Sequence, residues 1–317
     1  MSNSSKIIER IKREIGEDVY DLLAEKMSAP DLQSLLLEVY RRRVELLQPH
    51  HLFKQFKENR FVQPSSINPK LYIKLDDLAY SLASEYEAVE LSPLSPLGCN
   101  SIIAPVDQNN AVSTIRNTEV CSDSTNVLAL IAAQLRAELL KENPKSEETI
   151  KLCASFRVVR GQFVEGRGFV PHFRLFSMIT AGRDSGSFFF ETGALFEHID
   201  FYLTYLSALE KLGIHLKNKV ANITDFVGTR EARLGGEALA KLRETHADVT
   251  IQFDPDRTQG SGYYFPVGFQ IIADDHTGEN ILLVDGGFTD WTQQLLNNKK
   301  ERLLISGLGT ERLCLCF

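Results

Sequence analysis

Apolar residues recur at three- and four-residue steps over residues 4–60, and this spacing predicts helices. The first series places these apolar residues on one helix face: Ile7, Ile8, Ile11, Ile15, Val19 and Leu22. Ser28, Pro30 and Asp31 predict the start of a second helix, because this combination is typical of a helix N-terminus. We therefore expect an N-terminal helical domain over residues 1–60.

A longer block, residues 75–317, combines predicted helices with predicted strands. Residues 61–74 precede it and contain two prolines and two adjacent serines, so we expect a linker there. The helices predicted in the block are Leu75–Ser84, Asp123–Leu140 with Ser122 or Asp123 as its cap, Leu195–Leu212 and Glu231–Glu244.

The strands of this block are predicted from apolar runs bounded by turn residues. Leu152–Arg160 and Phe169–Gly182 form a long hairpin around the glycine-rich loop 161–168. The other predicted strands are Tyr86–Leu91, Val220–Phe226, Val249–Phe253, Tyr263–Ala273, Ile281–Val284 and an apolar strand that ends at Gly307. Hairpin-paired strands interrupted by helices are typical of an α+β fold, here an antiparallel β-sheet flanked by helices.

Charge and composition argue against several classes of protein. The net charge is −7 and the pI about 5.6, which disfavours broad attachment to nucleic acid. The densest basic run, Arg41–Arg43, is expected on the solvated side of its helix. No apolar run has the length of a membrane span, and charges within the first ten residues disfavour a signal peptide. Five cysteines without CxxC spacing predict a reducing, cytoplasmic location and no metal site.

Two arginines stand out on the predicted strands. Arg157 lies in the first strand of the long hairpin, with Arg160 and Arg167 near its loop, and Arg312 follows a Gly-x-Gly turn at the end of the last strand. Arginines on two neighbouring strands can bind two ends of a polyphosphate. The alternatives are that Arg157 pairs with a buried carboxylate and that Arg312 is a solvated residue beside a tight turn.

The order of these segments resembles the class II aminoacyl-tRNA synthetase catalytic core. Its motif 2 is a Phe-Arg strand, a loop and a returning strand, and its motif 3 is a Gly-x-Gly-x-Glu-Arg segment. The resemblance implies that Arg157 contacts the α-phosphate of ATP and Arg312 the γ-phosphate. Arg167, Gly307 and Gly309 would complete the nucleotide site.

The histidyl branch of that family is the most similar. Residues 257–264 resemble its Arg-Gly-Leu-Asp-Tyr-Tyr segment, residues 285–290 its Gly-Gly-Arg-Tyr-Asp segment, and residues 122–125 its Pro-Glu-Gly-Thr segment. Residues 86–96 resemble motif 1, the strand and proline at the dimer interface. The substrate-binding residues that this implies are Asp123, Thr125, Arg257, Tyr263, Tyr264, Gly286 and Gly287.

Some of these residues have simpler interpretations. Asp123 could be a helix cap only, because aspartate is favoured at that position. Tyr263 and Tyr264 could be ordinary strand residues, since tyrosine is favoured in sheets. Arg257 could be a surface loop arginine.

Three departures from the family pattern concern the adenine site. The motif 2 glutamate that receives the adenine amino group is replaced by Val159, the returning strand reads Pro171–Phe173, and the Gly-Gly-Arg position is Phe288. We therefore expect weak ATP binding with poor discrimination against GTP. No anticodon-binding domain follows Arg312 in the sequence, so we do not expect the protein to charge tRNA by itself.

The leading hypothesis is ATP-dependent activation of an amino acid or related carboxylate as an adenylate. It implies Mg²⁺ on the ATP phosphates, Arg157 and Arg312 as catalytic residues, and a homodimer. The alternative is a non-catalytic paralogue similar to the ATP phosphoribosyltransferase regulatory subunit. A third hypothesis is a scaffold that binds a protein partner through its N-terminal helices.

Overall fold

The computed structural model describes residues 3–162, 166, 168–229, 234 and 236–317. The chain divides into two compact units, residues 1–63 with 113–118 and residues 64–112 with 119–317. The division predicted from the sequence, with boundaries at residues 60 and 74, stays a prediction.

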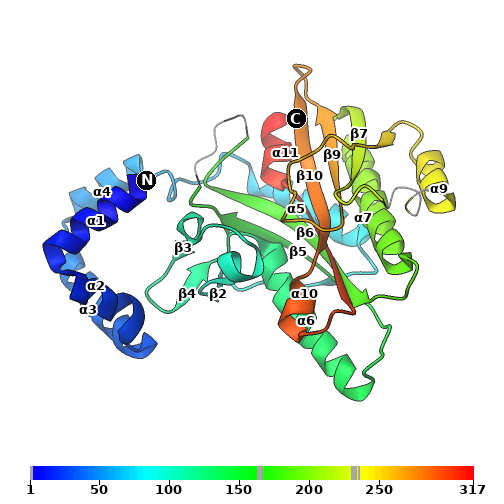
Figure 1. Cartoon of the computed structure of the whole chain (residues 1–317). Coiled ribbons are helices and arrows are strands. Elements are labelled where there is room, and N and C mark those ends of the chain that lie inside the picture. Colours follow the sequence, from blue (N-terminus) through cyan, green and yellow to red (C-terminus); the bar gives the residue numbers. More distant parts are fainter. Residues whose placement is uncertain (1–2, 163–165, 167, 230–233, 235) are drawn as a thin grey trace. The chain divides into compact units, whose positions relative to one another are not determined.

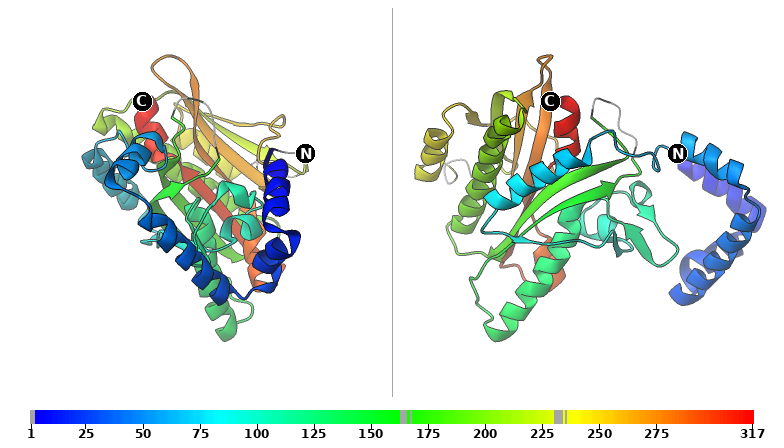
Figure 2. Two further views of the ribbon diagram at one scale, coloured as in Figure 1. Left: turned by 90° about the vertical axis from the view of Figure 1, so that its left-hand side faces the viewer. Right: turned by 180° about the vertical axis from the view of Figure 1, so that it is seen from behind.

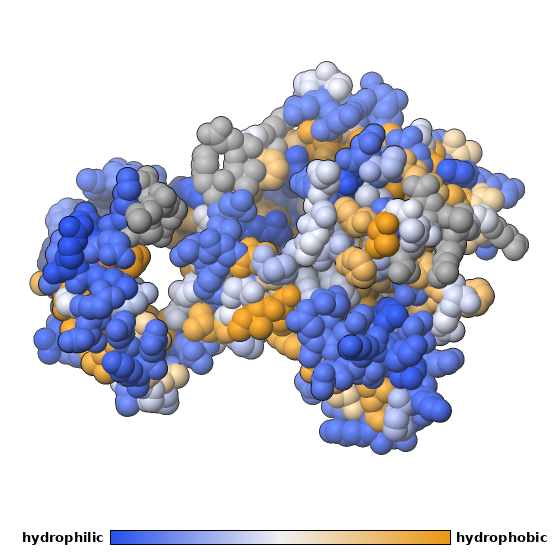
Figure 3. Space-filling view, viewed as in Figure 1, coloured by the Kyte–Doolittle hydropathy of each residue, from blue (hydrophilic) through white to orange (hydrophobic). Residues whose placement is uncertain are grey.

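The first unit is helical, as predicted. Its helices are α1 (Asn3–Ile15), α2 (Glu17–Asp21), the short π-helix η1 (Leu22–Lys26), α3 (Ala29–Glu45) and α4 (Pro49–Glu58). The Ser28 hydroxyl accepts a hydrogen bond from the Asp31 backbone N–H, which confirms the predicted start of α3. Arg41 and Arg42 are exposed and pair with Glu38, so this basic run lies on the solvated side of the helix. Figure 3 shows apolar and polar residues mixed over these helices.

The second unit contains an eight-stranded sheet with the order β1-β5-β6-β11-β10-β9-β7-β8 (Figure 1). Its strands are β1 (Glu87–Ala88), β5 (Ile150–Val159), β6 (His172–Arg183), β7 (Lys217–Asp225), β8 (Thr250–Phe253), β9 (Val267–Asp274), β10 (Asn280–Thr289) and β11 (Glu301–Leu308). The pairs β1–β5 and β7–β8 are parallel and the others antiparallel. The α+β class is therefore confirmed, with a mixed rather than a purely antiparallel sheet.

Helices cover both faces of this sheet. The helices that the structure describes in this unit are α5 (Pro69–Leu82), α6 (Ser124–Glu142), α7 (Phe189–Ala208), α9 (Glu237–Thr245), α10 (Trp291–Leu296) and α11 (Thr310–Cys316). Buried residues of α5, α7 and α11 pack in one core cluster, and those of α6 and α10 pack in another on the opposite face. We call these two faces the α7 face and the α6 face; Figure 2, seen from behind, shows α5 in cyan across the green strands β5 and β6.

Two helices begin earlier than the sequence pattern predicted. Helix α5 begins at Pro69 rather than Leu75, because the Asn68 side chain accepts a hydrogen bond from the Lys70 backbone N–H. Helix α7 begins at Phe189 rather than Leu195. The predicted helix 231–244 corresponds to α9 in part, and residues 231–233 and 235 lie outside the described residues.

The remaining elements are short. They are the strands β2 (Leu94–Pro96), β3 (Val112–Ser113) and β4 (Thr118–Val120), which form a second sheet, the π-helix η2 (Cys99–Ile103), and the 3₁₀-helices η3 (Gln108–Asn110) and η4 (Leu209–Leu212). The predicted motif 1 strand, Tyr86–Leu91, is thus reduced to the two residues of β1. Across the described residues, no helix combines the length and the apolar character needed to cross a membrane.

Alternation along β5 decides which side chains reach which face. Leu152 and Ala154 belong to the α6-face core, whereas Cys153 belongs to the α7-face core. Ser155 bonds to Asp76 of α5, in agreement with this alternation. Odd-numbered residues of β5 therefore face α5 and α7.

Candidate functional site

Asp123 is the N-cap residue of α6. Its Oδ1 atom accepts hydrogen bonds from the backbone N–H of Thr125 at 3.0 Å and from the Thr125 hydroxyl at 2.8 Å. Its Oδ2 atom lies 3.0 Å from Nη2 of Arg160. Asp123 is therefore a cap, as one interpretation predicted, and it also forms an ion pair with the residue that follows β5.

Arg160 lies on the α6 face at the end of β5. Its Nε donates to the Ser122 carbonyl at 3.1 Å, and its guanidinium lies 5.0 Å from the ring centroid of Phe173. The side chains of Arg160 and Asp123 are 44% and 21% exposed, so both charges of the pair can be reached from solvent. Such a pair is complementary to a zwitterion, with an ammonium group at the carboxylate and a carboxylate at the guanidinium.

Tyr263 and Tyr264 lie beside this pair. Their rings meet edge to face with centroids 4.9 Å apart, and Tyr263 makes a similar contact of 5.6 Å with Trp291 of α10. Burial raises the pKa of both tyrosines, and the Asp123 carboxylate acts in the same direction on each. Tyr264 is therefore buried and Tyr263 half-buried, both within electrostatic range of the N-terminus of α6.

Arg257 is buried behind the tyrosines. Its Nη2 lies 2.9 Å from Oδ1 of Asp285 on β10, and its Nε donates to the Gln259 carbonyl at 2.8 Å. Burial raises the pKa of Asp285, and the nearby guanidinium opposes that rise. Among the described groups, none accepts a hydrogen bond from Arg257 Nη1. Arg257 is thus a buried, paired residue and not a surface loop arginine.

The two predicted glycines of β10 face in different directions. A Cβ atom on Gly287 would lie 2.6 Å from the ring of Tyr264, so glycine there allows the tyrosine to pack against the strand. A Cβ atom on Gly286 would instead meet Phe269 at 2.6 Å and Ser306 at 2.7 Å, in the core of the α7 face. Of the two, only Gly287 borders the tyrosines.

Arg157 points away from this cluster, toward the α7 face. Its Nη1 lies 2.7 Å from Oε2 of Glu311 on α11 and 2.9 Å from Nδ1 of His172. Its guanidinium also lies 5.6 Å from the ring centroid of Tyr72 on α5. The Glu311 side chain is 3% exposed, so Arg157 pairs with a buried carboxylate, the alternative considered from the sequence.

The expectation that Arg157 shares a site with Asp123 and Tyr264 is therefore wrong. Arg157 and Arg160 are three residues apart on nearly extended chain, so their side chains point to opposite faces of the sheet. The resemblance selected Arg157, and the geometry selects Arg160 as the arginine beside Asp123.

Arg312 lies in the first turn of α11, as predicted. Its guanidinium lies 4.4 Å from the ring centroid of Phe169. Burial lowers the pKa of Arg312, and its buried Nε has no hydrogen-bond partner among the described residues. Arg312 is therefore a half-buried cation, and a guanidinium in this position suits an anionic ligand.

The other predicted nucleotide-site residues surround Arg312 in part. Gly309 is the N-cap residue of α11. A Cβ atom on Gly307 would lie 3.2 Å from Leu175, which places Gly307 on the α6 face beside that side chain. Arg167 lies outside the described residues.

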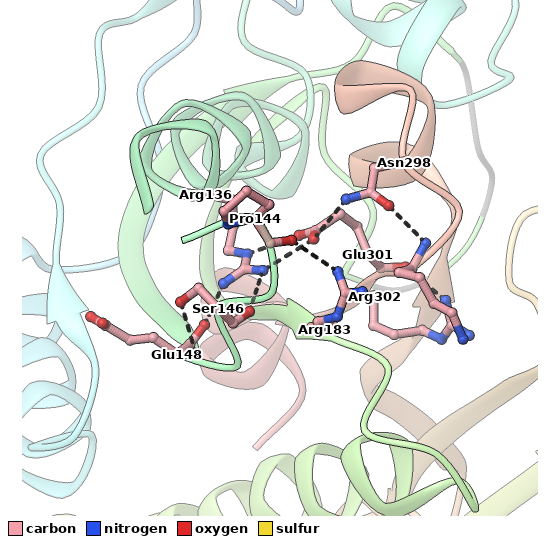
Figure 4. Close-up of polar contacts among 9 residues, drawn as sticks. Arg136, Pro144, Ser146, Glu148, Arg183, Asn298, Glu301 and Arg302 are labelled. Carbon is pink, nitrogen blue, oxygen red and sulfur yellow. Dashed lines mark hydrogen bonds and ion pairs between the residues drawn. The ribbon is translucent and has the colours of Figure 1, made fainter. Parts of the chain in front are cut away.

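A buried ion pair joins α6, whose N-cap residue is Asp123, to β11, the strand that precedes α11 and Arg312. Nε and Nη2 of Arg136 on α6 lie 2.8 and 3.0 Å from the two carboxylate oxygens of Glu301 on β11 (Figure 4). Nη1 and Nη2 of Arg136 also donate to the carbonyls of Glu148 and Ser146. Both ionised side chains are 0% exposed, so the pair fixes α6 against β11.

Sequence reasoning missed three residues of the cluster. Arg160 was placed near the loop and given no role, although its parity relative to Arg157 showed that the two face opposite ways. Asp285 and Trp291 carried no signal of their own, because they come together with Arg257 and Tyr263 only in the folded chain.

Comparisons with known proteins identify the fold. No protein family model matches the chain, and no curated protein matches it. The apo histidyl-tRNA synthetase of S. aureus superposes with a TM-score of 0.59 at 15% identity, covering 81% of this chain and 68% of the other. An ATP phosphoribosyltransferase regulatory subunit/histidyl-tRNA synthetase from Bacillus halodurans gives 0.54 at 14% identity, covering 79% and 81%.

A threonyl-tRNA synthetase from Aeropyrum pernix, described as putative, also superposes, with a TM-score of 0.54 at 13% identity. It covers 76% of this chain, which in turn spans 58% of the synthetase. These likenesses show that the chain has the class II synthetase fold, with histidyl and threonyl synthetases and the regulatory subunit among its structural neighbours.

Proposed function

We propose that the protein binds an amino acid or related carboxylate between Asp123 and Arg160 and activates it as an adenylate with ATP. The observation that supports this most directly is the half-exposed Asp123–Arg160 ion pair at the N-terminus of α6. The ammonium group of the substrate would displace Arg160 from Asp123. Arg160 would then be free to neutralise charge on the substrate carboxylate and the attacked α-phosphate.

Centring motif 2 on Arg160 also changes the expected adenine site. The family pattern Arg-x-Glu then falls on Arg160-Gly161-Gln162 instead of on Arg157 and Val159. The side-chain carbonyl of Gln162 is exposed and can accept a hydrogen bond from the adenine amino group, which Val159 cannot. This proposal replaces the expectation of poor discrimination between ATP and GTP.

The remaining phosphates of ATP would be held by Arg312, whose buried Nε has no partner among the described residues. The part of the chain that the structure describes contains no group of three or more metal-ligating side chains. Mg²⁺ would therefore be bound mainly by the phosphate oxygens, and the reaction needs no protein nucleophile. Catalysis would come from positioning and charge stabilisation.

The test is ATP–pyrophosphate exchange with each of the twenty amino acids in turn. Arg160→Ala should lower the exchange rate by roughly 10²–10³, as for loss of one preorganised charge stabiliser. Arg116→Ala, at another exposed arginine, is the matched control and should leave the rate unchanged. Exchange that persists in Arg160→Ala would refute the assigned role, and no exchange with any amino acid would refute adenylation of a proteinogenic substrate.

The second candidate is a non-catalytic amino acid-binding protein, similar in role to a regulatory subunit. It is favoured by the stacking of Arg312 on Phe169 and by the engagement of Arg157 with Glu311, which leave fewer cations for ATP. Calorimetry separates the two. Both candidates predict amino acid binding that is lost in Asp123→Ala, but only this candidate predicts that the original protein does not bind ATP.

A homodimer and a cytoplasmic location are parts of the same proposal. Three exposed apolar residues, Leu94, Leu97 and Ile102, gather on and after β2, where Figure 3 shows an apolar patch. An apolar patch of this kind favours an interface with a second copy. Protein contacts of the N-terminal helices are proposed on the same ground, since the apolar side chains of α3 and α4 are not buried.

A further inference from the structure

A cavity of about 390 Å³ lies on the α7 face, the side of the sheet opposite Asp123. It is bordered by the C-terminal end of α5, the middle of α7 and the start of β5. Its volume falls in the range of small-molecule sites, about 300–1,000 Å³. None of the residues assigned above to the amino acid or ATP lines it.

The inner wall of the cavity is apolar and aromatic. Ala83, Tyr86 and Phe201 are each less than 10% exposed and form this wall. Tyr86 is held in place through its hydroxyl, which lies 3.0 Å from Oγ1 of Thr180. Thr180 is bonded in turn to the fully buried His198 at 2.9 Å. These hydrogen bonds fix the position of the Tyr86 ring in the wall.

The rim of the cavity is acidic. It is lined by the carboxylates of Glu85, Glu197 and Asp200 and by one ammonium group, that of Lys151. Asp200 accepts from Nε2 of His246 at 2.7 Å, which leaves the first two carboxylates to Lys151. An excess of carboxylates beside an aromatic ring attracts organic cations.

Lys151 shows which chemistry this environment accommodates. Its Nζ lies 2.7 Å from Glu197, 3.5 Å from Glu85 and 5.6 Å from the ring centroid of Tyr86. An ammonium group of the chain itself is thus bound by carboxylates and by the face of an aromatic ring. An ammonium ligand bound by the same carboxylates would compete with Lys151 for them.

We propose that this cavity binds a small organic ammonium ion carrying an aromatic or alkyl group. The ammonium would bind Glu197 and Glu85, and the apolar part would occupy the wall of Ala83, Tyr86 and Phe201. This site is distinct from the amino acid site, because the sheet separates them, and it does not depend on the proposed adenylation.

The test is isothermal calorimetry of the full-length protein with benzylammonium chloride. Saturable binding is expected, with benzyl alcohol at least about tenfold weaker and benzoate without detectable binding. Glu197→Gln should weaken benzylammonium about tenfold, because it removes a charge-assisted hydrogen bond. Lys151→Met should strengthen it, because it removes the competing ammonium. Glu142→Gln, at an exposed carboxylate on α6, is the control and should change nothing.

Three results would overturn the proposal. They are an absence of saturable binding up to roughly 10 mM, equal affinity in Glu197→Gln and the original protein, and loss of binding in Asp123→Asn with retention in Glu197→Gln. The last would place the probe in the amino acid site. If Glu197→Gln fails to fold, Glu85→Gln takes its place and should weaken binding, whereas Lys151→Met should strengthen it, since both residues lie at the rim. Unchanged affinity in both variants would then overturn the proposal.

Discussion

Replacing Glu301 by glutamine tests whether the ion pair with Arg136 holds the sheet unit together. The substitution preserves the shape of the side chain and one acceptor, and it removes the charge. Its new amide group would place a donor against the Nε or Nη2 of Arg136, both of which now bond to the carboxylate. The guanidinium would remain buried with no counter-charge.

The size of the effect follows from the burial of the pair. Both side chains are 0% exposed, so neither charge can be solvated without opening the structure. Breaking a buried ion pair by removing one partner costs about 3–5 kcal/mol. We expect Glu301→Gln to lower the free energy of unfolding by that amount, from a total that is typically about 5–15 kcal/mol.

Urea denaturation followed by the fluorescence of Trp291 measures this loss. Trp291 is the single tryptophan, is 2% exposed and packs in the same core cluster as Leu303 and Ile305 of β11. Its signal therefore reports on the sheet unit. Lys300→Gln is the matched control, because Lys300 is 59% exposed and its pair with Asp184 should contribute less than about 1 kcal/mol.

A loss below about 1 kcal/mol in Glu301→Gln would refute the reasoning. It would mean that water reaches the pair or that Arg136 finds other acceptors. The double variant Arg136→Met/Glu301→Leu supplies a second check. The single variants Arg136→Met and Glu301→Leu are measured beside it. The double variant should lose about 2 kcal/mol less free energy of unfolding than the sum of these two single losses, the coupling expected of residues in direct contact.

Three further predictions concern pH, assembly and nucleic acid. Burial lowers the pKa of His198 to about 3, so between pH 7 and pH 5 the unfolded chain binds a proton that the folded chain does not bind. The free energy of unfolding should therefore fall by about 2 kcal/mol over this range. In urea titrations, His198→Gln should reduce this pH dependence. Light scattering at micromolar concentration should give about twice 35.7 kDa, and a monomer would refute the dimer. Total tRNA should be neither charged nor shifted on gels at physiological salt, because phosphate contacts need clustered Lys and Arg and the net charge is −7; efficient charging would contradict this.

Most of the fold followed from periodicity and turn residues, and each miss has a physical cause. The long hairpin, the helix after Asp123 and the final strand-turn-helix are present as predicted. The start of α5 was missed because Pro64 and Pro69 suggested a linker, although a proline after Asn68 also suits the first turn of a helix. The parallel pairings of β1 with β5 and of β8 with β7 could not be predicted, because they join segments that are distant in sequence.

The cluster around Asp123 was predicted better than the surroundings of Arg157 and Arg312. Asp123, Thr125, Tyr263 and Tyr264 are brought together, although they come from segments far apart in the sequence. These residues belong to the segments 122–125 and 257–264, and the order of these segments along the chain identified them. The arginine expected from the resemblance to motif 2 had no such constraint, because Phe156-Arg157 and Val159-Arg160 both lie at or near the end of the same strand.

Parity along β5 shows why the sequence could not choose between those two arginines. Side chains of Arg157 and Arg160 must face opposite ways, but a sheet covered by helices on both faces has apolar residues at both parities. Cys153 and Val159 alternate with Leu152 and Val158 without marking either side as the ligand side. The contact of Arg160 with Asp123 distinguishes the faces, and that contact links residues 37 apart in sequence. The same contact makes Arg160→Ala, and not Arg157→Ala, the variant that separates a ligand-binding role from a stabilising one.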